Sequence, residues 1–346
     1  MPSKKVTMQD IADACGLSRN TVSKVFNGRG AVPPATQQRI LQKAEELGYR
    51  QAYKSVPKQM TSTDYSKSIA LLTQRMPENY HFGTIFLPYF TQTLSRFGYT
   101  LMMYEISGEE TERRVLPAHL NLAQTAGILC MELFDRQYQD MICSLGIPAL
   151  FMDMFANAGT VPPKCDVLYM ENVASTVSLT KHVIAQGARR LGFVGDINHC
   201  NSFYERWMGF RAALEESGLA LERSLCILAD DREPYHDPEW LGSKLREMPV
   251  MPDAFVCAND FLAIHMLAAL KRLSLSVPND VMLTGFDGLP QSGMTDPAIT
   301  TAEIPSIDIA RLAADILAGR IQNPERPCRI TYVQTTPVWR ASTHRT

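Results

Sequence analysis

The fold of the N-terminal region is decided by residues 6–27, which read VTMQDIADACGLSRNTVSKVFN. Apolar residues in the first half recur at i, i+3, i+4 and i+7, which puts one apolar stripe on a helix that starts near Thr7. Gly16 ends this helix, and Ser18 is a good N-cap for a second one. The inward-facing residues of the two helices are expected to be Met8, Ile11, Ala12, Cys15, Val22, Val25 and Phe26.

A third helix is predicted from about Pro34, a residue that suits the first helical position, to a stop at Gly48. Its apolar positions are Ile40, Leu41, Ala44 and Leu47. Three helices within about fifty residues form a small bundle. Two short helices joined by a glycine turn, the second beginning in a polar run, are typical of a helix-turn-helix.

The polar residues at the front of the second helix have the chemistry of base readers. Arg19 pairs with guanine and Asn20 with adenine, while Ser18, Thr21 and Ser23 reach phosphates. The alternative interpretation is a solvated polar face on a purely structural helix.

Four stretches of this region closely resemble the headpiece of the LacI (lac repressor) family of bacterial transcription regulators. They are residues 6–12, 16–18, 21–27 and 44–49, in the family's order. The resemblance implies that Arg19, Asn20 and Lys24 contact bases. We expect the DNA-binding residues to be Ser18, Arg19, Asn20, Thr21, Ser23, Lys24, Asn27, Lys4 and Lys5.

Charge is divided unequally along the chain. Residues 1–60 carry ten Lys and Arg against four Asp and Glu, a net charge of +6, so the net charge of −2 leaves −8 for the remainder. A basic head on an acidic body favours a polyanion-binding module joined to a separate regulatory or catalytic domain.

Composition excludes several protein classes. With 346 residues, 45% of them hydrophobic and 20% charged, the chain is typical of globular proteins with two or three domains. No apolar run approaches the roughly 18 residues of a membrane helix, and the N-terminus lacks the apolar stretch of a signal peptide, so we expect a cytoplasmic protein. The eight cysteines show no zinc spacing and are expected to be reduced thiols.

Residues 51–67 are polar, lack a helical stripe and are predicted to be a linker or hinge. In the family this segment forms a hinge helix whose leucine wedges into the minor groove. Here Lys58 stands at the leucine position, and Pro57 disfavours a continuous helix. We therefore favour major-groove binding with little bending, and Val56 or Met60 as a substitute wedge is the alternative.

From residue 68 onward, short apolar runs alternate with amphipathic stretches, which predicts parallel sheets with helices on both faces. The candidate strands are residues 69–72, 100–104, 127–131, 149–152, 191–194, 254–257 and 281–284. The candidate helices include residues 84–97, 176–185, 206–216, 260–273 and 307–319.

This body also resembles the LacI family and the periplasmic sugar-binding fold, through residues 146–153, 171–187, 206–210, 258–260, 285–287 and 300–301. The resemblance implies an all-α helix-turn-helix headpiece (1–50) before an α/β two-lobed periplasmic-binding-protein-like core (68–346) with effector between the lobes. We expect one lobe at residues 68–165 plus 304–328 and the other at 166–303 plus 329–340.

Several polar residues follow predicted strands, where ligands of parallel sheets bind. Asp153, Asn259 and Asp287 offer acceptors, and Arg206, expected to open a helix, offers a guanidinium fork that suits sugar hydroxyls. An Asp in such a place often only caps a turn. Phe286, Phe82 and Trp240 are candidate stacking partners, although core packing is the simpler interpretation of each, as it is for His265.

The sequence therefore predicts a DNA-binding transcriptional regulator, a repressor controlled by a sugar or sugar derivative. A nucleoside, a nucleobase, a partner protein or no effector at all are the alternatives. A homodimer reading a pseudo-palindromic double-stranded operator is expected. No dinucleotide fingerprint, Walker loop or nucleophile elbow occurs, so neither an enzyme nor a cofactor nor a metal site is expected.

Overall fold

The computed structural model describes residues 6–26, 32–47, 68–76, 82–158 and 164–345. The chain divides into two compact units, Met1–Tyr65 and Ser66–Thr346. The predicted contacts of Lys4, Lys5 and Asn27, and the questions raised by Val56, Pro57, Lys58 and Met60, lie outside the described residues. No helix of the described residues has the length and apolar character needed to cross a membrane.

The N-terminal unit contains three helices, α1 (Met8–Cys15), α2 (Arg19–Phe26) and α3 (Pro34–Glu46). Thr7 and Asp10 form a capping box at the start of α1, and Gly16 ends the helix with a left-handed φ of 61°. The core of this unit consists of Ile11, Ala12, Cys15, Val22, Val25, Val32, Ile40 and Ala44. Leu47, an apolar position of the third helix expected from the sequence, lies beyond the end of α3 and is 36% exposed.

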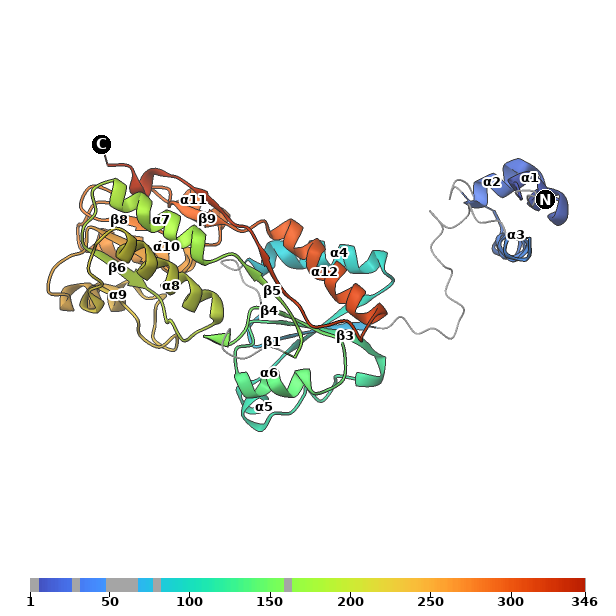
Figure 1. The fold of residues 1–346 in the computed structure, drawn as a ribbon, viewed down its shortest axis with the longest axis horizontal. Helices are drawn as coiled ribbons and strands as arrows, with labels where there is room; N and C mark the ends of the chain where they lie inside the picture. Colours follow the sequence, from blue (N-terminus) through green and yellow to red (C-terminus); the bar gives the residue numbers. More distant parts are fainter. Residues whose placement is uncertain (1–5, 27–31, 48–67, 77–81, 159–163, 346) are drawn as a thin grey trace. The chain divides into compact units, whose positions relative to one another are not determined.

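The first lobe of the second unit is built on a six-stranded parallel sheet in the order β10-β5-β4-β3-β1-β2. Its strands are β1 (Ser68–Thr73), β2 (Thr100–Glu105), β3 (Thr125–Met131), β4 (Ala149–Met152), β5 (Asp166–Met170) and β10 (Ile330–Val333). Helices α4 (Gly83–Arg96) and α12 (Ser306–Gln322) cover one face, and α5 (Gly108–Arg113) and α6 (Arg136–Cys143) the other (Figure 1).

Alternating side chains of the central strands supply both cores of this lobe. Ile69 and Leu71 of β1 belong to the cluster with α4 and α12, whereas Ala70 and Leu72 belong to the cluster with α6. This division follows from the two-residue period of a strand. It explains why the predicted strands read as continuous apolar runs, since parallel sheets are buried on both faces.

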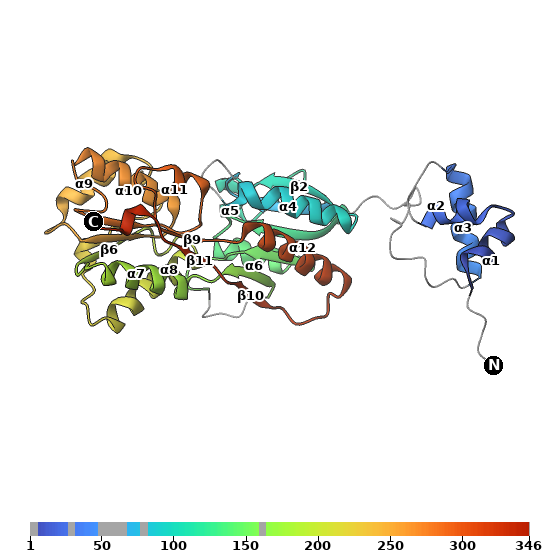
Figure 2. The same cartoon turned by 90° about the horizontal axis from the view of Figure 1, so that it is seen from above.

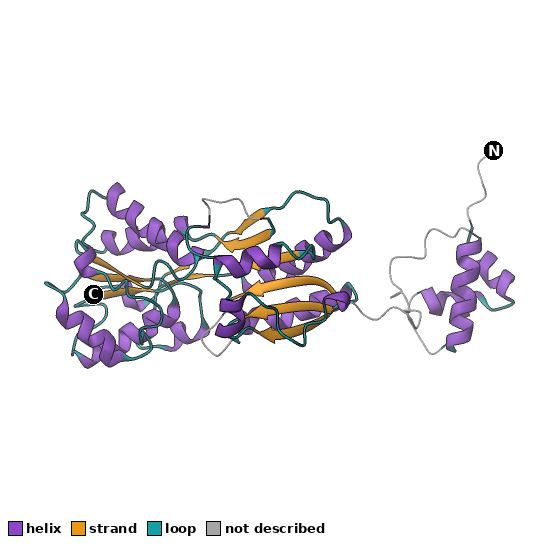
Figure 3. Ribbon diagram, turned by 90° about the horizontal axis from the view of Figure 1, so that it is seen from below, coloured by secondary structure: helices purple, strands orange, loops and turns teal. Residues whose placement is uncertain are grey.

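The second lobe has a parallel three-stranded sheet, β6-β7-β8, and an antiparallel pair, β9 and β11. Helices lie on both sides of its strands (Figure 3). The strands are β6 (Leu191–Val194), β7 (Ala254–Cys257), β8 (Met282–Thr284), β9 (Thr301–Glu303) and β11 (Thr336–Val338). The helices are α7 (Val173–Ala185), α8 (Asn201–Glu216), α9 (Pro238–Glu247), α10 (Asp260–Arg272) and α11 (Pro290–Met294).

The chain passes between the lobes in three places, after β5, after β9 and after β10; Figure 2 shows β9 and β11 side by side near these crossings. Both β5 and β10 pair within the six-stranded sheet. The lobe boundaries expected at residues 165/166 and 328/329 are therefore too early in the chain. β10 escaped prediction because it is an edge strand with alternating exposure, which lacks the apolar run of the central strands.

The cysteine prediction was wrong for one pair. Cys143 at the end of α6 and Cys165 just before β5 form a disulfide, with Cα atoms 5.9 Å apart. The two residues are 22 positions apart in sequence and become neighbours only because α6 packs beside the central strands. The other six cysteines are free.

Candidate functional site

The exposed face of α2 carries the predicted base readers. Arg19, Asn20 and Lys24 are exposed, whereas Val22 and Val25 of the same helix are buried. The Ser18 side chain accepts a hydrogen bond from the Thr21 backbone N–H at 3.1 Å, as an N-cap does. This cap gives Ser18 a structural role in starting the helix in addition to the predicted phosphate contact.

A second candidate site is a cavity of about 210 Å³ lined by side chains of both lobes of the second unit. The first lobe contributes Arg75, Met76, Phe82, Glu132, Phe134, Met152, Asp153 and Met170. The second contributes His199, Cys200, Ser202, Phe203, Arg206, Asn259, Phe261 and Asp287. We call it the first cavity. Five of the seven predicted effector residues line it, namely Asp153, Arg206, Asn259, Asp287 and Phe82.

The three acids of the first cavity share an unusual backbone. Glu132 follows β3, Asp153 follows β4 and Asp287 follows β8, with φ values of 49°, 78° and 108°. Non-glycine residues rarely adopt positive φ, and such strain concentrates at binding sites, where the surrounding structure maintains it. Of the six non-glycine residues with positive φ in the described part of the chain, three line this cavity, which favours a binding role for it.

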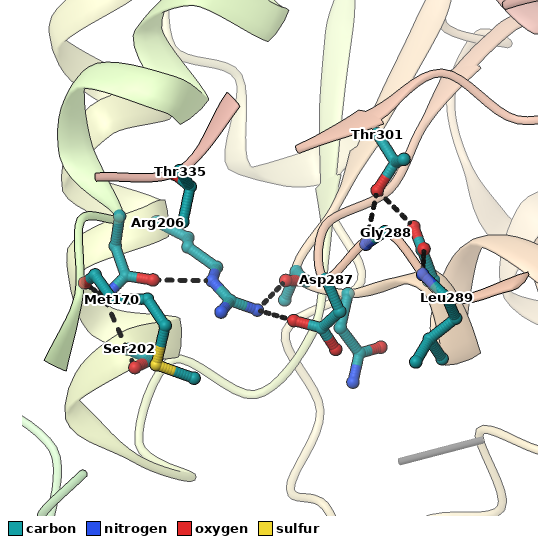
Figure 4. Close-up of polar contacts among 12 residues, drawn as sticks. Met170, Ser202, Arg206, Asp287, Gly288, Leu289, Thr301 and Thr335 are labelled. Carbon is teal, nitrogen blue, oxygen red and sulfur yellow. Dashed lines mark hydrogen bonds and ion pairs between the residues drawn. The ribbon is translucent and has the colours of Figure 1, made fainter. Parts of the chain in front are cut away.

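Arg206 is the most constrained charged group in the first cavity (Figure 4). Its Nε donates to Asn172 Oδ1 at 2.9 Å, and its Nη1 donates to Ala258 O at 2.7 Å and to Asp287 Oδ1 at 3.2 Å. Cζ lies 3.7 Å from the centroid of the Phe286 ring. Among the described residues, none accepts a hydrogen bond from Nη2. The guanidinium is thus held rigidly with donors left for a ligand.

The prediction that Arg206 opens a helix was wrong. Helix α8 begins at Asn201, so Arg206 lies in its second turn. The first residues of α8 are polar and read as loop in the sequence. Of the three candidate stacking partners, two agree with the core-packing interpretation: Phe286 lies under the Arg206 guanidinium, and Trp240 packs on Tyr235 with ring centroids 5.0 Å apart. Neither residue lines the first cavity.

Asn259 and His265 both interact within α10. The Asn259 side chain caps the helix by accepting from Leu262 N at 2.9 Å, and this residue also lines the first cavity. The His265 Nδ1 lies 2.9 Å from Phe261 O, one turn earlier in the helix.

Sequence reasoning missed an aromatic row in the first cavity. The ring of His199 lies 4.9 Å, centroid to centroid, from Phe134 of the first lobe and from Phe203 of its own lobe. Burial lowers the pKa of His199, but its 2.7 Å contact with Asp231 and the charges of Glu132 and Asp153 outweigh burial and raise it. Phe134 is far from His199 and Phe203 in the chain, and all three lie near polar residues. The sequence therefore does not indicate that their rings lie together.

The first turns of α8 join the two lobes. Asp153 of the first lobe accepts from Ser202 N at 3.2 Å, and burial raises the pKa of this carboxyl. Asn201 N donates to Met154 O at 2.9 Å. Glu205 accepts from the Tyr332 hydroxyl of β10 at 2.7 Å. These contacts hold the lobes together beside Arg206.

Asn172 connects that lobe junction to the first cavity. Its Oδ1 accepts from Arg206 Nε, while its Nδ2 donates to Glu205 Oε2 at 2.8 Å and to Met170 O at 2.9 Å. The side chain is buried, so each bond compensates for lost hydration. Asn172 lies in the stretch 171–187 that resembles the LacI family, but no role in the site was predicted for it.

Asp260, the first residue of α10, is fully buried and close enough to Asp287 to be affected by its charge. Its carboxylate accepts from Thr301 Oγ1 at 2.7 Å and from Leu289 N at 2.8 Å; these bonds are drawn in Figure 4. Burial, and then the charge of Asp287, raise the pKa of Asp260 from 3.8 to about 7. A Cβ atom at Gly285 would collide with this carboxylate, so glycine is required there.

This raised pKa predicts a pH-dependent stability. Because the folded state holds the proton more tightly than the unfolded state, the stabilising contribution is complete below about pH 4 and is lost as the pH rises through about 7. We expect the Tm of the native protein to fall by several degrees relative to Asp260→Asn between pH 4 and 8. Thermal unfolding across this range tests it, with exposed Asp315→Asn as the control. A constant difference between native protein and Asp260→Asn would contradict it.

Comparisons with known proteins agree with this two-part architecture. Residues 7–51 match the model of bacterial regulatory proteins, lacI family, and residues 180–343 match the periplasmic binding protein-like domain. The HTH-type transcriptional repressor PurR of Aliivibrio salmonicida is 26% identical over 98% of this chain and 99% of its own length. The ribose operon repressor of Halalkalibacterium halodurans is 24% identical over 95% and 97%.

Solved structures share the fold over nearly the whole chain. A transcriptional regulator CelR–cellobiose complex has a TM-score of 0.70 at 24% identity, covering 97% of this chain and 99% of that one. The lac repressor dimer bound to operator and the anti-inducer ONPF has a TM-score of 0.69 at 21% identity, covering 98% and 99%. Helix-turn-helix headpiece, two-lobed core and sequence matches lead to one conclusion: the chain joins a headpiece of the lacI family of bacterial regulatory proteins to a periplasmic binding protein-like domain.

Proposed function

We propose that this regulator is a transcriptional repressor that binds a pseudo-palindromic operator as a homodimer and is controlled by a neutral, hydroxyl-bearing small molecule. The exposed row Arg19, Asn20 and Lys24 on α2 supports the DNA-reading role, since exposed polar side chains of a recognition helix contact base edges. The relatives named as repressors support the direction of regulation.

The observation that carries the effector assignment is the ion pair of buried Arg206 with Asp287 at 3.2 Å, on the second-lobe side of the first cavity. Its fixed donors and acceptors face a cavity that also contains Glu132 and Asp153, and adjacent sugar hydroxyls both donate and accept hydrogen bonds. Aromatic rings such as Phe134 and Phe203 suit the apolar face of a pyranose. The same rings suit a nucleobase, which is the second candidate.

The proposed control is a change in lobe orientation. A ligand that binds one arrangement of the lobes more tightly shifts the population toward it. In a dimer, that shift changes the spacing of the two recognition helices, which must match half-sites about one DNA turn apart. Effector and operator affinities are then coupled reciprocally. Equal operator affinity without and with saturating effector would overturn this control.

A thermal-shift screen tests the effector class. We expect one class among monosaccharides, disaccharides, sugar phosphates, nucleosides and nucleobases to raise the Tm, because ligand at about 100 times its Kd adds ~2.7 kcal/mol of stability. The increase should disappear in Asp287→Ala and persist in the exposed control Asp315→Ala. A panel without any hit would remove the small-molecule part of the proposal and leave the DNA-binding part standing.

Operator binding tests the headpiece assignment. Arg19→Ala is expected to cost about 1–3 kcal/mol on the cognate operator and to relax specificity at one base pair. Lys4→Ala is expected to weaken binding to all sequences similarly, since a lysine near phosphates reads charge alone. Competitive binding to matched and mismatched duplexes measures both. An unchanged specificity ratio for Arg19→Ala would refute base contact by this residue.

A further inference from the structure

A second cavity, of about 340 Å³, lies beside the first cavity. Phe82 and Asp287 line both cavities. The other lining residues come from the first turn of α4, the turn after β8 and the segment that leads into α12. They are Ile85, Gly288, Leu289, Glu303, Ile304, Pro305, Ser306, Ile307 and Asp308, of which Glu303 ends β9 and the last three form the first turn of α12.

The charge of the second cavity differs from that of the first. Asp287, Glu303 and Asp308 line it, and none of its described lining residues is Lys, Arg or His. Asp308 makes an ion pair at 3.2 Å with Arg311, which is not part of the lining. Carboxylate oxygens accept hydrogen bonds from hydroxyl groups and repel phosphate or carboxylate. The second cavity therefore suits a neutral group rich in hydroxyls and disfavours an anion.

The backbone that carries Asp287 at the second cavity is fixed against residues 302–304. An isolated bridge pairs Asp287 with Glu303, Asp287 N donates to Ala302 O at 2.9 Å, and Ile304 N donates to Asp287 O at 3.2 Å. A Cβ atom at Gly288 would lie 2.7 Å from Glu303 Cα, so the two segments approach as closely as glycine permits. Asp287 and Glu303 are thus held in fixed relation before any ligand arrives, which lowers the cost of binding.

The sizes of the cavities bear on the size of the ligand. Small-molecule sites generally have volumes of ~300–1,000 Å³. The first cavity alone lies below that range, and its neighbour offers more space than the first contains. Phe82 and Asp287 line both cavities. A ligand confined to the first cavity would therefore contact these two residues from that cavity alone.

We propose that the effector extends past Phe82 and Asp287 into the second cavity, and that the part it places there is a neutral glycosyl unit. The effector is then a disaccharide or a longer saccharide, with one unit at Arg206 and the next beside Glu303 and Ile85. This inference rests on the proposed function, because it extends the ligand assigned to the first cavity.

Titration calorimetry on the full-length protein tests this, using disaccharides and the monosaccharides that compose them. The native protein is expected to bind its preferred disaccharide at least about tenfold more tightly than either component. Ile85→Trp, which fills the second cavity, should remove that advantage and leave monosaccharide affinity unchanged. Thr91→Trp, exposed on the same helix and outside both linings, is the matched control.

A second tryptophan variant and a phosphorylated ligand test the same proposal independently. Ile307→Trp fills the same space from α12 and replaces Ile85→Trp if that variant does not fold. A phosphate on the second unit should weaken binding, and Glu303→Gln should reduce that penalty. Any of three results would overturn this inference. They are equal affinity for disaccharide and monosaccharide, equal loss of both affinities in the tryptophan variants, and tighter binding of the phosphorylated ligand. Failure of all saccharides would also overturn this inference, and binding of a nucleoside or nucleobase would then leave the proposed function standing.

Discussion

Replacing Arg206 by lysine is expected to weaken effector binding by about 30-fold or more. The guanidinium simultaneously engages Asn172, Ala258 O and Asp287 from a buried position over the Phe286 ring. A lysine ammonium is a compact point charge without the planar fork, so it cannot keep these contacts and also present a donor to the cavity. Disturbing a buried, hydrogen-bonded charge pair costs about 2–5 kcal/mol, and each ~1.4 kcal/mol is a factor of ten in Kd.

The measurement is effector affinity by calorimetry, followed by operator affinity with and without effector. Arg206→Lys should lose the operator response at effector concentrations that saturate the native protein. Arg211→Lys, on the exposed side of the same helix, makes the same chemical change outside the cavity and should behave like the native protein. Unchanged effector affinity in Arg206→Lys would show that the Arg206–Asp287 pair is structural and that the ligand binds elsewhere.

The parts of the site that sequence could predict are those fixed by local pattern. Asp153, Asn259 and Asp287 were found because each directly follows an apolar run, and the ends of parallel strands meet at one edge of a sheet. The headpiece helices were found because their caps and apolar stripes are local. Predicted and observed helix and strand bounds differ mostly at polar ends, as at the start of α8.

The parts that sequence could not predict depend on how the lobes meet. Phe134 and His199 come from different lobes, and nothing near either residue in the chain indicates that their rings approach. For Trp240 the sequence left stacking on a ligand and core packing both open, because an aromatic residue on an amphipathic helix does not show which neighbour it faces. The disulfide and the placement of β10 likewise follow from tertiary packing alone.

Replacing Asn172 by alanine is expected to damage both effector affinity and allosteric coupling. One amide group bonds Arg206 in the first cavity and Glu205 at the lobe junction, where Tyr332 of the other lobe donates to Glu205. Removing it leaves Arg206 Nε and Glu205 without these partners in a buried setting, at about 1–3 kcal/mol for each unsatisfied group. Effector affinity should fall about tenfold or more, and the coupling free energy, typically ~1–3 kcal/mol, should approach zero.

Tyr332→Phe separates the two effects, because it deletes only the hydroxyl that bridges the lobes and leaves the bonds of Asn172 in place. In this variant effector affinity should stay within a few-fold of the native value while the effector-induced change in operator affinity shrinks. Asn172→Asp keeps an acceptor for Arg206 but sets a carboxylate against Glu205, and so should lose coupling more than affinity. If Asn172→Ala retained the native ratio of operator affinities with and without effector, the signal would have to leave the cavity by another path, such as the Asp153 bond to Ser202. Lobe orientation would then be set independently of Arg206.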